Sequence, residues 1–187
     1  MKKLLLVAVA FMGIYTADAQ IVVEDVTVEK SVTVDGKELM LNGAGLREKL
    51  WIDLYVGGLY TTTKSSDGKA IVNADEFMAI TLDIVSKLVT QDKMISSVEE
   101  GFQASTSKAE RKALQPKIDK FIGFFNKPIV SGNEFQLSYV PGKGTMVHKN
   151  GALLGTIEGM DFKKALFGIW LGDKPADDDL KDGLLGK

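Results

Sequence analysis

Few residues of this sequence have the types and spacing of a catalytic or binding group, and Arg47 is the strongest of them. It stands two residues after Gly43-Ala44-Gly45 and just before an aromatic and β-branched stretch, residues 50–63. A guanidinium there is either solvated at a strand end or paired with an anion, because a buried unpaired charge costs several kcal/mol. Position 47 is therefore a candidate anion site, with the solvated alternative left open.

The other candidate groups indicate no catalytic or metal centre. His148 is the only histidine, and its place just before Asn150-Gly151 favours a solvent-facing strand position over a catalytic one. The acidic run 177–179 could attract a hard cation, but a solvated helix start is the commoner explanation. Gly43-Ala44-Gly45 resembles half of a phosphate loop, yet we expect it between strands, without a following helix to hold an anion.

The first residues predict export. Lys2 and Lys3 are followed by an apolar run from Leu4 to about Tyr15 and by small residues ending at Ala19, which is the order of a cleavable signal peptide. The run is shorter than the roughly 20 residues that span a bilayer, so a retained anchor is less favoured. We expect residues 1–19 to be removed and residues 20–187 to form a single domain, without a transmembrane segment, in the periplasm or outside a bacterial cell.

Composition limits the partners and the chemistry. The 187 residues carry a formal net charge of −2 and contain no cysteine. The charge gives no reason to expect nucleic acid or an anionic membrane surface as partner. The missing thiols exclude disulfides, thiol catalysis and thiolate zinc sites. We expect no cofactor, no metal and a monomer whose stability rests on its hydrophobic core.

Hydrophobic spacing predicts strands at both ends of the mature chain and helices between and after them. The expected strands are a hairpin over 22–41 turning at Asp35-Gly36, a strand over 50–63 bulged or bent at Gly57-Gly58, a strand over 77–85, and three strands between 135 and 157 with turns at 141–144 and Asn150-Gly151. The expected helices are a short one before Ala74, one capped by Thr90, and others over 114–125, 161–171 and 177–185. This order predicts an α+β domain with an antiparallel sheet and helices against one face.

Four segments in this order resemble the chalcone isomerase-like family. They are Leu-Asn-Gly-Ala-Gly-Leu-Arg at 41–47 leading into the Tyr-Val-Gly-Gly-Leu-Tyr strand at 55–60, Tyr-Val-Pro-Gly-Lys-Gly-Thr at 139–145, the Asn-Gly pair at 150–151, and the Trp-Leu-Gly helix within 162–175. The resemblance extends from about Val26 to Leu185. It implies an open-faced β-sandwich in which a ligand cleft lies between a large antiparallel sheet and a helical layer.

The resemblance also implies two alternative roles for Arg47. In members that isomerise chalcones, the arginine of this turn polarises the substrate carbonyl, and in fatty-acid-binding relatives it pairs with a carboxylate. The enzymes' other polar residues do not carry over, since Tyr55, Met94 and Gly101 stand where those enzymes have threonine, tyrosine and asparagine, and Lys163 stands near their serine or threonine. Each lost hydrogen-bond donor would remove about 2–4 kcal/mol of charge stabilisation.

We therefore expect a non-catalytic protein that binds a fatty acid or a similar apolar carboxylate. The expected ligand-binding residues are Arg47, Tyr55, Met94, Val98 and Phe102. One alternative is an isomerase or intramolecular lyase acting on an enone, with Arg47 as electrophile and Tyr55 as proton donor. The other is a cell-envelope interaction protein without a small ligand, in which side chains fill the cleft and Arg47 is solvated or paired with an internal acid.

Overall fold

The structure, a computed structural model, describes residues 21–187, so the expected signal peptide lies outside the described residues. One antiparallel sheet of seven strands runs in sequence order from β3 to β9. A separate hairpin, β1–β2, precedes it. The strands are β1 (Ile21–Val23), β2 (Val26–Val28), β3 (Ser31–Val34), β4 (Lys37–Lys49), β5 (Ile52–Thr61), β6 (Met78–Ile84), β7 (Glu134–Val140), β8 (Gly144–Lys149) and β9 (Ala152–Ile157).

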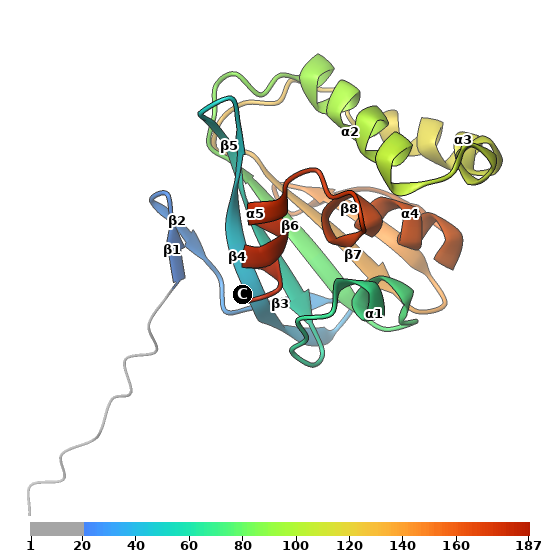
Figure 1. The fold of residues 1–187 in the computed structure, drawn as a ribbon, viewed down its shortest axis with the longest axis horizontal. Coiled ribbons are helices and arrows are strands. Elements are labelled where there is room, and N and C mark those ends of the chain that lie inside the picture. The colour runs from blue at the N-terminus through green and yellow to red at the C-terminus, as the bar shows by residue number, and fades with distance from the viewer. Residues whose placement is uncertain (1–20) are drawn as a thin grey trace, which may run out of the picture.

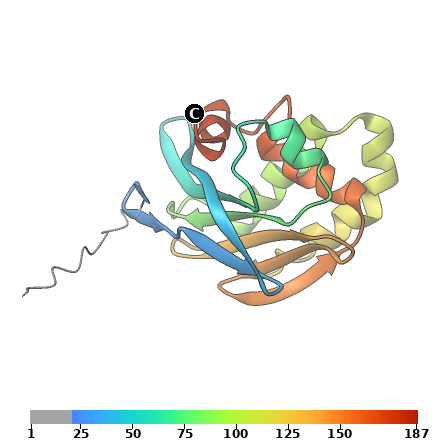
Figure 2. The same cartoon turned by 90° about the horizontal axis from the view of Figure 1, so that it is seen from below.

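The helices of the described residues gather on one side of the curved sheet, as Figure 2 shows. They are α1 (Gly68–Asn73), α2 (Gln91–Ser105), α3 (Lys108–Ile122), α4 (Met160–Leu171) and α5 (Asp178–Leu184). This arrangement confirms the predicted α+β class with an antiparallel sheet packed against a helical layer (Figure 1). Within residues 21–187, no helix has both the length and the apolar character needed to cross a bilayer.

The main core lies between the sheet and the helices. Alternate residues of the central strands, such as Ile80 and Leu137, are buried there, as the two-residue period of a strand requires. Three phenylalanines join three helices, because Phe102 of α2, Phe121 of α3 and Phe162 of α4 have ring centroids 5.7 to 6.1 Å apart. The helical layer is therefore held together by its own aromatic cluster.

A second, smaller core lies on the other face of the sheet. Val34 and Leu39 of the β3–β4 hairpin pack there with Val56 of β5. The hairpin turn is tied to the turn between β7 and β8, because the Lys143 ammonium lies 2.6 Å from a carboxylate oxygen of Asp35. The sheet thus curls, and both of its faces are partly covered.

Helices α2 and α3 each begin directly after a residue that caps their first turn. The Thr90 side chain accepts a hydrogen bond from Lys93 N at 3.4 Å, which confirms the predicted cap of α2. Helix α3 begins at Lys108, earlier than predicted, because Ser107 and Glu110 form a capping box with bonds of 3.2 and 2.8 Å. Polar first turns carry no apolar period, so the spacing of buried residues detects this helix only from Leu114 onward.

The structure corrects three predictions about the N-terminal strands. The predicted turn at Asp35-Gly36 is confirmed, but the segment 22–41 forms two hairpins and not one, with a further turn at Glu24-Asp25. Gly43-Ala44-Gly45 lies inside β4, where a Cβ at Gly43 would overlap the carbonyl oxygen of Gly183 in α5. The pairing of β5 with β6 continues without a shift through Gly57-Gly58, and the irregularities lie between Leu41 and Gly43 and between Arg47 and Glu48. Gly43, Gly45 and Gly57 serve close packing of α5 on the sheet, whereas a Cβ at Gly58 would meet Thr81 and Tyr60.

Candidate functional site

Arg47 lies near the end of β4, opposite Tyr55 of β5. Its Nη1 atom lies 2.7 Å from Oδ2 of Asp177 and also donates to the backbone oxygen of Glu48 at 3.2 Å. The side chains of Arg47 and Asp177 are only 16% and 13% exposed. Position 47 therefore does bind an anion, and in this structure the anion is an acid of the chain itself.

Asp177 holds its place through α5. Its Oδ1 atom accepts a hydrogen bond from Leu180 N at 2.8 Å, which caps the helix. Helix α5 in turn rests on the glycines of β4, since a Cβ at Gly45 would lie 3.3 Å from the Leu180 carbonyl oxygen. The acidic run 177–179 does begin a helix, as predicted. The alternative without a small ligand expected an internal acid beside Arg47, and that acid is Asp177, which the sequence did not identify because 130 residues separate the two.

Tyr55 connects the sheet to α4 directly beside Arg47. Its hydroxyl accepts a hydrogen bond from Trp170 Nε1 at 2.9 Å, and both side chains are buried. Burial raises the pKa of the Tyr55 phenol, and the Trp170 bond and the Arg47 charge offset only part of this effect. The phenol therefore stays protonated at neutral pH. Sequence reasoning missed Trp170 as a neighbour of the site, although it belongs to the Trp-Leu-Gly helix.

The three predicted residues of α2 are buried in the same core as Tyr55. Met94, Val98 and Phe102 follow one another at four-residue spacing and are at most 8% exposed. Tyr55 and these three side chains all belong to the main hydrophobic core, and the Arg47 guanidinium lies beside Tyr55.

The positions of Gly101 and Lys163 serve packing. A Cβ at Gly101 would lie 2.8 Å from the Ile169 side chain, so α2 and α4 touch at this point. The Lys163 ammonium is fully buried and donates to the carbonyl oxygens of Ile71, Val72 and Ala74 at 2.7, 2.7 and 2.9 Å. Burial lowers the pKa of Lys163 to about 8. Its three bonds satisfy the carbonyls at the end of α1 and make it a structural residue.

His148 lies on the sheet face away from the helices. It is half-buried, where the sequence predicts solvent exposure, and lines a hollow of about 220 Å³ with Gln136 and Ser138. Burial lowers its pKa, and Nδ1 has no hydrogen-bond partner among the described residues. Within residues 21–187, no group of three or more histidines and carboxylates is placed to hold a metal ion.

A second hollow of about 230 Å³ lies near α1 and is lined by residues such as Thr61, Ile71 and Met78. Neither hollow is lined by the five predicted ligand-binding residues. In this structure those residues are packed as part of the core or, for Arg47, paired at its edge.

Known proteins share both the sequence pattern and the fold of this chain. Residues 20–186 match the sequence profile described as chalcone isomerase-like. The chain belongs to the chalcone isomerase-like family. No curated protein sequence matches it. Its fold is similar to the crystal structure of a fatty-acid binding protein of Arabidopsis thaliana, with a TM-score of 0.69, 18% identity, and coverage of 90% of this chain and 97% of that one.

These findings confirm the chalcone isomerase-like family and its fold. At 18% identity, the likeness to the plant protein shows the fold alone. The chemistry of this candidate site therefore depends on its own residues. A half-buried guanidinium that already contacts a carboxylate, beside a neutral phenol and an indole, is suited to hold an anionic head group.

Proposed function

We propose that this chain is a non-catalytic binder of a fatty acid or a similar apolar carboxylate, held between the sheet and the helices. The observation that carries the proposal is the place of the Arg47 guanidinium, which is only 16% exposed, lies opposite Tyr55 of the main core and holds a carboxylate oxygen at 2.7 Å. The same guanidinium binds a ligand carboxylate, by donating hydrogen bonds to it, when that group replaces Asp177.

Exchange of one carboxylate for another keeps the guanidinium paired. Removing a partner from a buried ion pair costs about 3–5 kcal/mol, so the ligand has to supply the charge that Asp177 gives up. Both side-chain bonds of Arg47 described above use Nη1. A guanidinium has five N–H donors, and a carboxylate that uses two of them in parallel is held with a fixed orientation.

In this proposal the hydrocarbon tail packs against the buried face of α2, which carries Met94, Val98 and Phe102. Met94 is unbranched and flexible, and such side chains move easily to accommodate a ligand. Each buried CH₂ group contributes about 0.8 kcal/mol. Because Met94 and Val98 are packed in the core, the tail enters by displacing side chains of this face.

Three further observations support a binder over an isomerase or lyase. The similar plant structure is named a fatty-acid binding protein. Met94 and Gly101, at the positions where the family's enzymes have polar residues, carry no group that transfers a proton. The raised pKa of the Tyr55 phenol opposes its ionisation.

Export is the second part of the proposal. The basic, apolar and small-residue order of residues 1–19 supports cleavage after Ala19. The intact mass of the protein recovered from the periplasm of a bacterial host, measured beside the cytoplasmic precursor, tests it. A periplasmic protein whose mass equals that of residues 20–187 supports export. Recovery of the uncleaved chain in the cytoplasm alone contradicts it.

The binding test compares two ligands with the same tail. Oleate and oleyl alcohol are titrated into the chain starting at Gln20, into Arg47→Ala, and into Arg111→Ala as the control. Arg111 is the only other arginine of the sequence. We expect the wild type and Arg111→Ala to prefer oleate and Arg47→Ala to lose this preference. Equal affinity of Arg47→Ala and wild type for oleate would contradict the proposal.

A further inference from the structure

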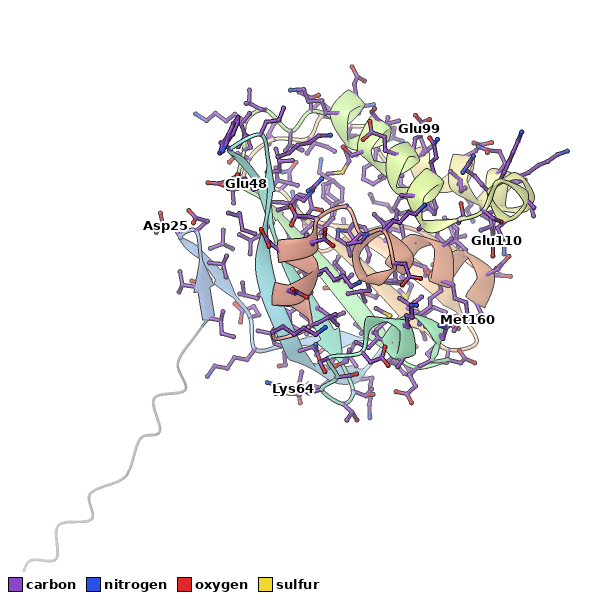
Figure 3. All side chains as sticks on the ribbon, in the orientation of Figure 1. Asp25, Glu48, Lys64, Glu99, Glu110 and Met160 are labelled. Atoms are coloured by element: carbon purple, nitrogen blue, oxygen red, sulfur yellow. The ribbon has the colours of Figure 1, made fainter. Side chains whose placement is uncertain are left out.

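The tip of the β4–β5 hairpin carries two large apolar side chains in water. Leu50 and Trp51 are the turn residues, and they are 75% and 90% exposed. Figure 1 places this tip at the upper left edge of the molecule, and Figure 3 labels Glu48, which lies near the outer end of β4. The hairpin thus presents its most apolar residues at a protruding point.

The backbone at the tip is strained for these residue types. Leu50 and Trp51 have φ values of +54° and +61°, a region in which a bulky side chain clashes with its own backbone. Three other two-residue hairpin turns among the described residues also have positive φ at both positions. Two of them use Asp35-Gly36, with φ of +50° and +80°, and Asn150-Gly151, with φ of +49° and +77°, the residues that such turns favour. The third uses the polar pair Glu24-Asp25, with φ of +44° and +62°, so Leu50-Trp51 is the apolar pair among the four.

The tip therefore lowers the stability of the fold in two ways, because its backbone is strained and because it exposes apolar surface to water. Neither cost is offset by packing within the described fold, since both side chains stand in solvent. Strain that the fold itself does not need is characteristic of functional sites.

The residues around the tip extend the same surface. Ile52 and Leu88 are 37% and 49% exposed. The loop that carries Leu88 lies beside the base of the hairpin, where Leu54 O accepts hydrogen bonds from Val85 N and Ser86 N. Lys49 and Lys87, both exposed, flank these apolar residues. Tryptophan, leucine and nearby lysines are the residue types that occupy the interface of a lipid bilayer.

We propose that the Leu50–Trp51 tip inserts into the interfacial layer of a lipid bilayer. A specific protein partner would need a broad surface of about 800 Å² on each side, whereas a bilayer accepts a protruding pair of side chains. The net charge of −2 gives no attraction to anionic lipid, so the binding is apolar in origin and does not require charged head groups.

The tip also lies on the same hairpin as the candidate carboxylate site. Arg47 pairs with Tyr55 only three residues before Leu50, a distance of about 10 Å along a strand. An inserted tip would hold the Arg47 site close to the lipid surface, from which an amphiphile can pass. This link rests on the proposed function, but insertion of the tip does not.

The test uses the chain starting at Gln20, which leaves out the apolar run of residues 1–19 and keeps the whole described fold. Vesicles of phosphatidylcholine and phosphatidylethanolamine are sedimented with the protein. The variant Leu50→Asn/Trp51→Gly gives the tip the chain's own Asn150-Gly151 turn. We expect it to partition at least about tenfold less and to unfold at a higher temperature, because the strain is relieved.

Two controls complete the experiment. Leu153→Ser removes another exposed apolar side chain, 54% exposed on β9, and is expected to bind vesicles like the wild type. Arg47→Ala is also expected to bind them normally, so failure of fatty-acid binding and failure of insertion are distinguishable. Absence of vesicle binding by the wild type, equal binding by the Asn-Gly variant, or release by 1 M salt would each overturn the proposal.

Discussion

The carboxylate of Asp177 lies 2.7 Å from Nη1 of Arg47 and closes the candidate site from within the chain. The contact joins the end of β4 to the start of α5, and the same carboxylate caps that helix through Leu180 N. In the proposed function, a ligand carboxylate competes with this partner, which the helix holds in place, and the strength of the competition would set the affinity of the site.

Asp177→Asn should bind oleate more tightly than the wild type. Asparagine is as good a helix cap as aspartate, so α5 keeps its start while the competing charge is gone. We expect up to about tenfold tighter binding, or about 1.4 kcal/mol, by isothermal titration. Asp177→Ala is the comparison, because it also loses the cap, at a cost of about 0.5–2 kcal/mol of stability. Unchanged or weaker binding by Asp177→Asn would count against competition at Arg47.

Tyr55→Phe should destabilise the fold. The change leaves the buried Trp170 Nε1–H without its partner, which costs about 1–3 kcal/mol and can be measured by urea unfolding. The double variant Tyr55→Phe/Trp170→Phe serves as control, since it removes both polar groups. Its loss of stability should be smaller than the sum of the two single losses, and simple additivity would show that the bond contributes little.

Lys163 should give the free energy of unfolding a specific pH dependence. Burial lowers its pKa to about 8 in the folded protein, against about 10.4 in an unfolded chain. Between these values the unfolded state binds more protons, so the contribution of Lys163 to stability rises with pH. Unfolding of the wild type and Lys163→Met at pH 7 and pH 9.5 measures this. The wild type should gain stability relative to the variant, and a constant difference would contradict the assignment.

Asp83 should give the free energy of unfolding the opposite pH dependence, and at lower pH. Burial, and then the charge of Glu134 opposite it on β7, raise the pKa of Asp83 to about 6. The folded state therefore binds more protons than the unfolded state between about pH 4 and pH 6, and stability falls as pH rises through this window. Asp83→Asn should be more stable than the wild type at pH 7, with the advantage shrinking at pH 4. An equal advantage at both pH values would exclude ionisation of Asp83 as its cause.

Local sequence patterns predicted much of the fold. Asp35-Gly36 and Asn150-Gly151 mark hairpin turns by their backbone preferences, and the apolar spacing of Met94, Val98 and Phe102 marks the buried face of α2. These signals lie within a few residues of one another. Arg47 was also singled out locally, because a charge at the start of an apolar strand needs an explanation.

The missed features depend on contacts between distant segments. Asp177 and Trp170 lie 130 and 115 residues from their partners Arg47 and Tyr55, and no periodicity reveals such pairs. Leu50 and Trp51 have strand propensity and were predicted within a strand, but the pairing of β4 with β5 makes them a turn. Tertiary pairing thus overrides local preference at Leu50 and Trp51, and only tertiary contacts reveal the partners of Arg47 and Tyr55.

The most direct test of the account follows the carboxyl group of the ligand itself. Oleate labelled with ¹³C at the carboxyl carbon is bound to the wild type and to Arg47→Ala, and its NMR shift is followed from pH 8 to pH 4. If the guanidinium pairs with the ligand, the pKa of the bound carboxyl group in the wild type lies below that in Arg47→Ala, because an adjacent positive charge favours the ionised form. Identical titrations in the two proteins would contradict the account.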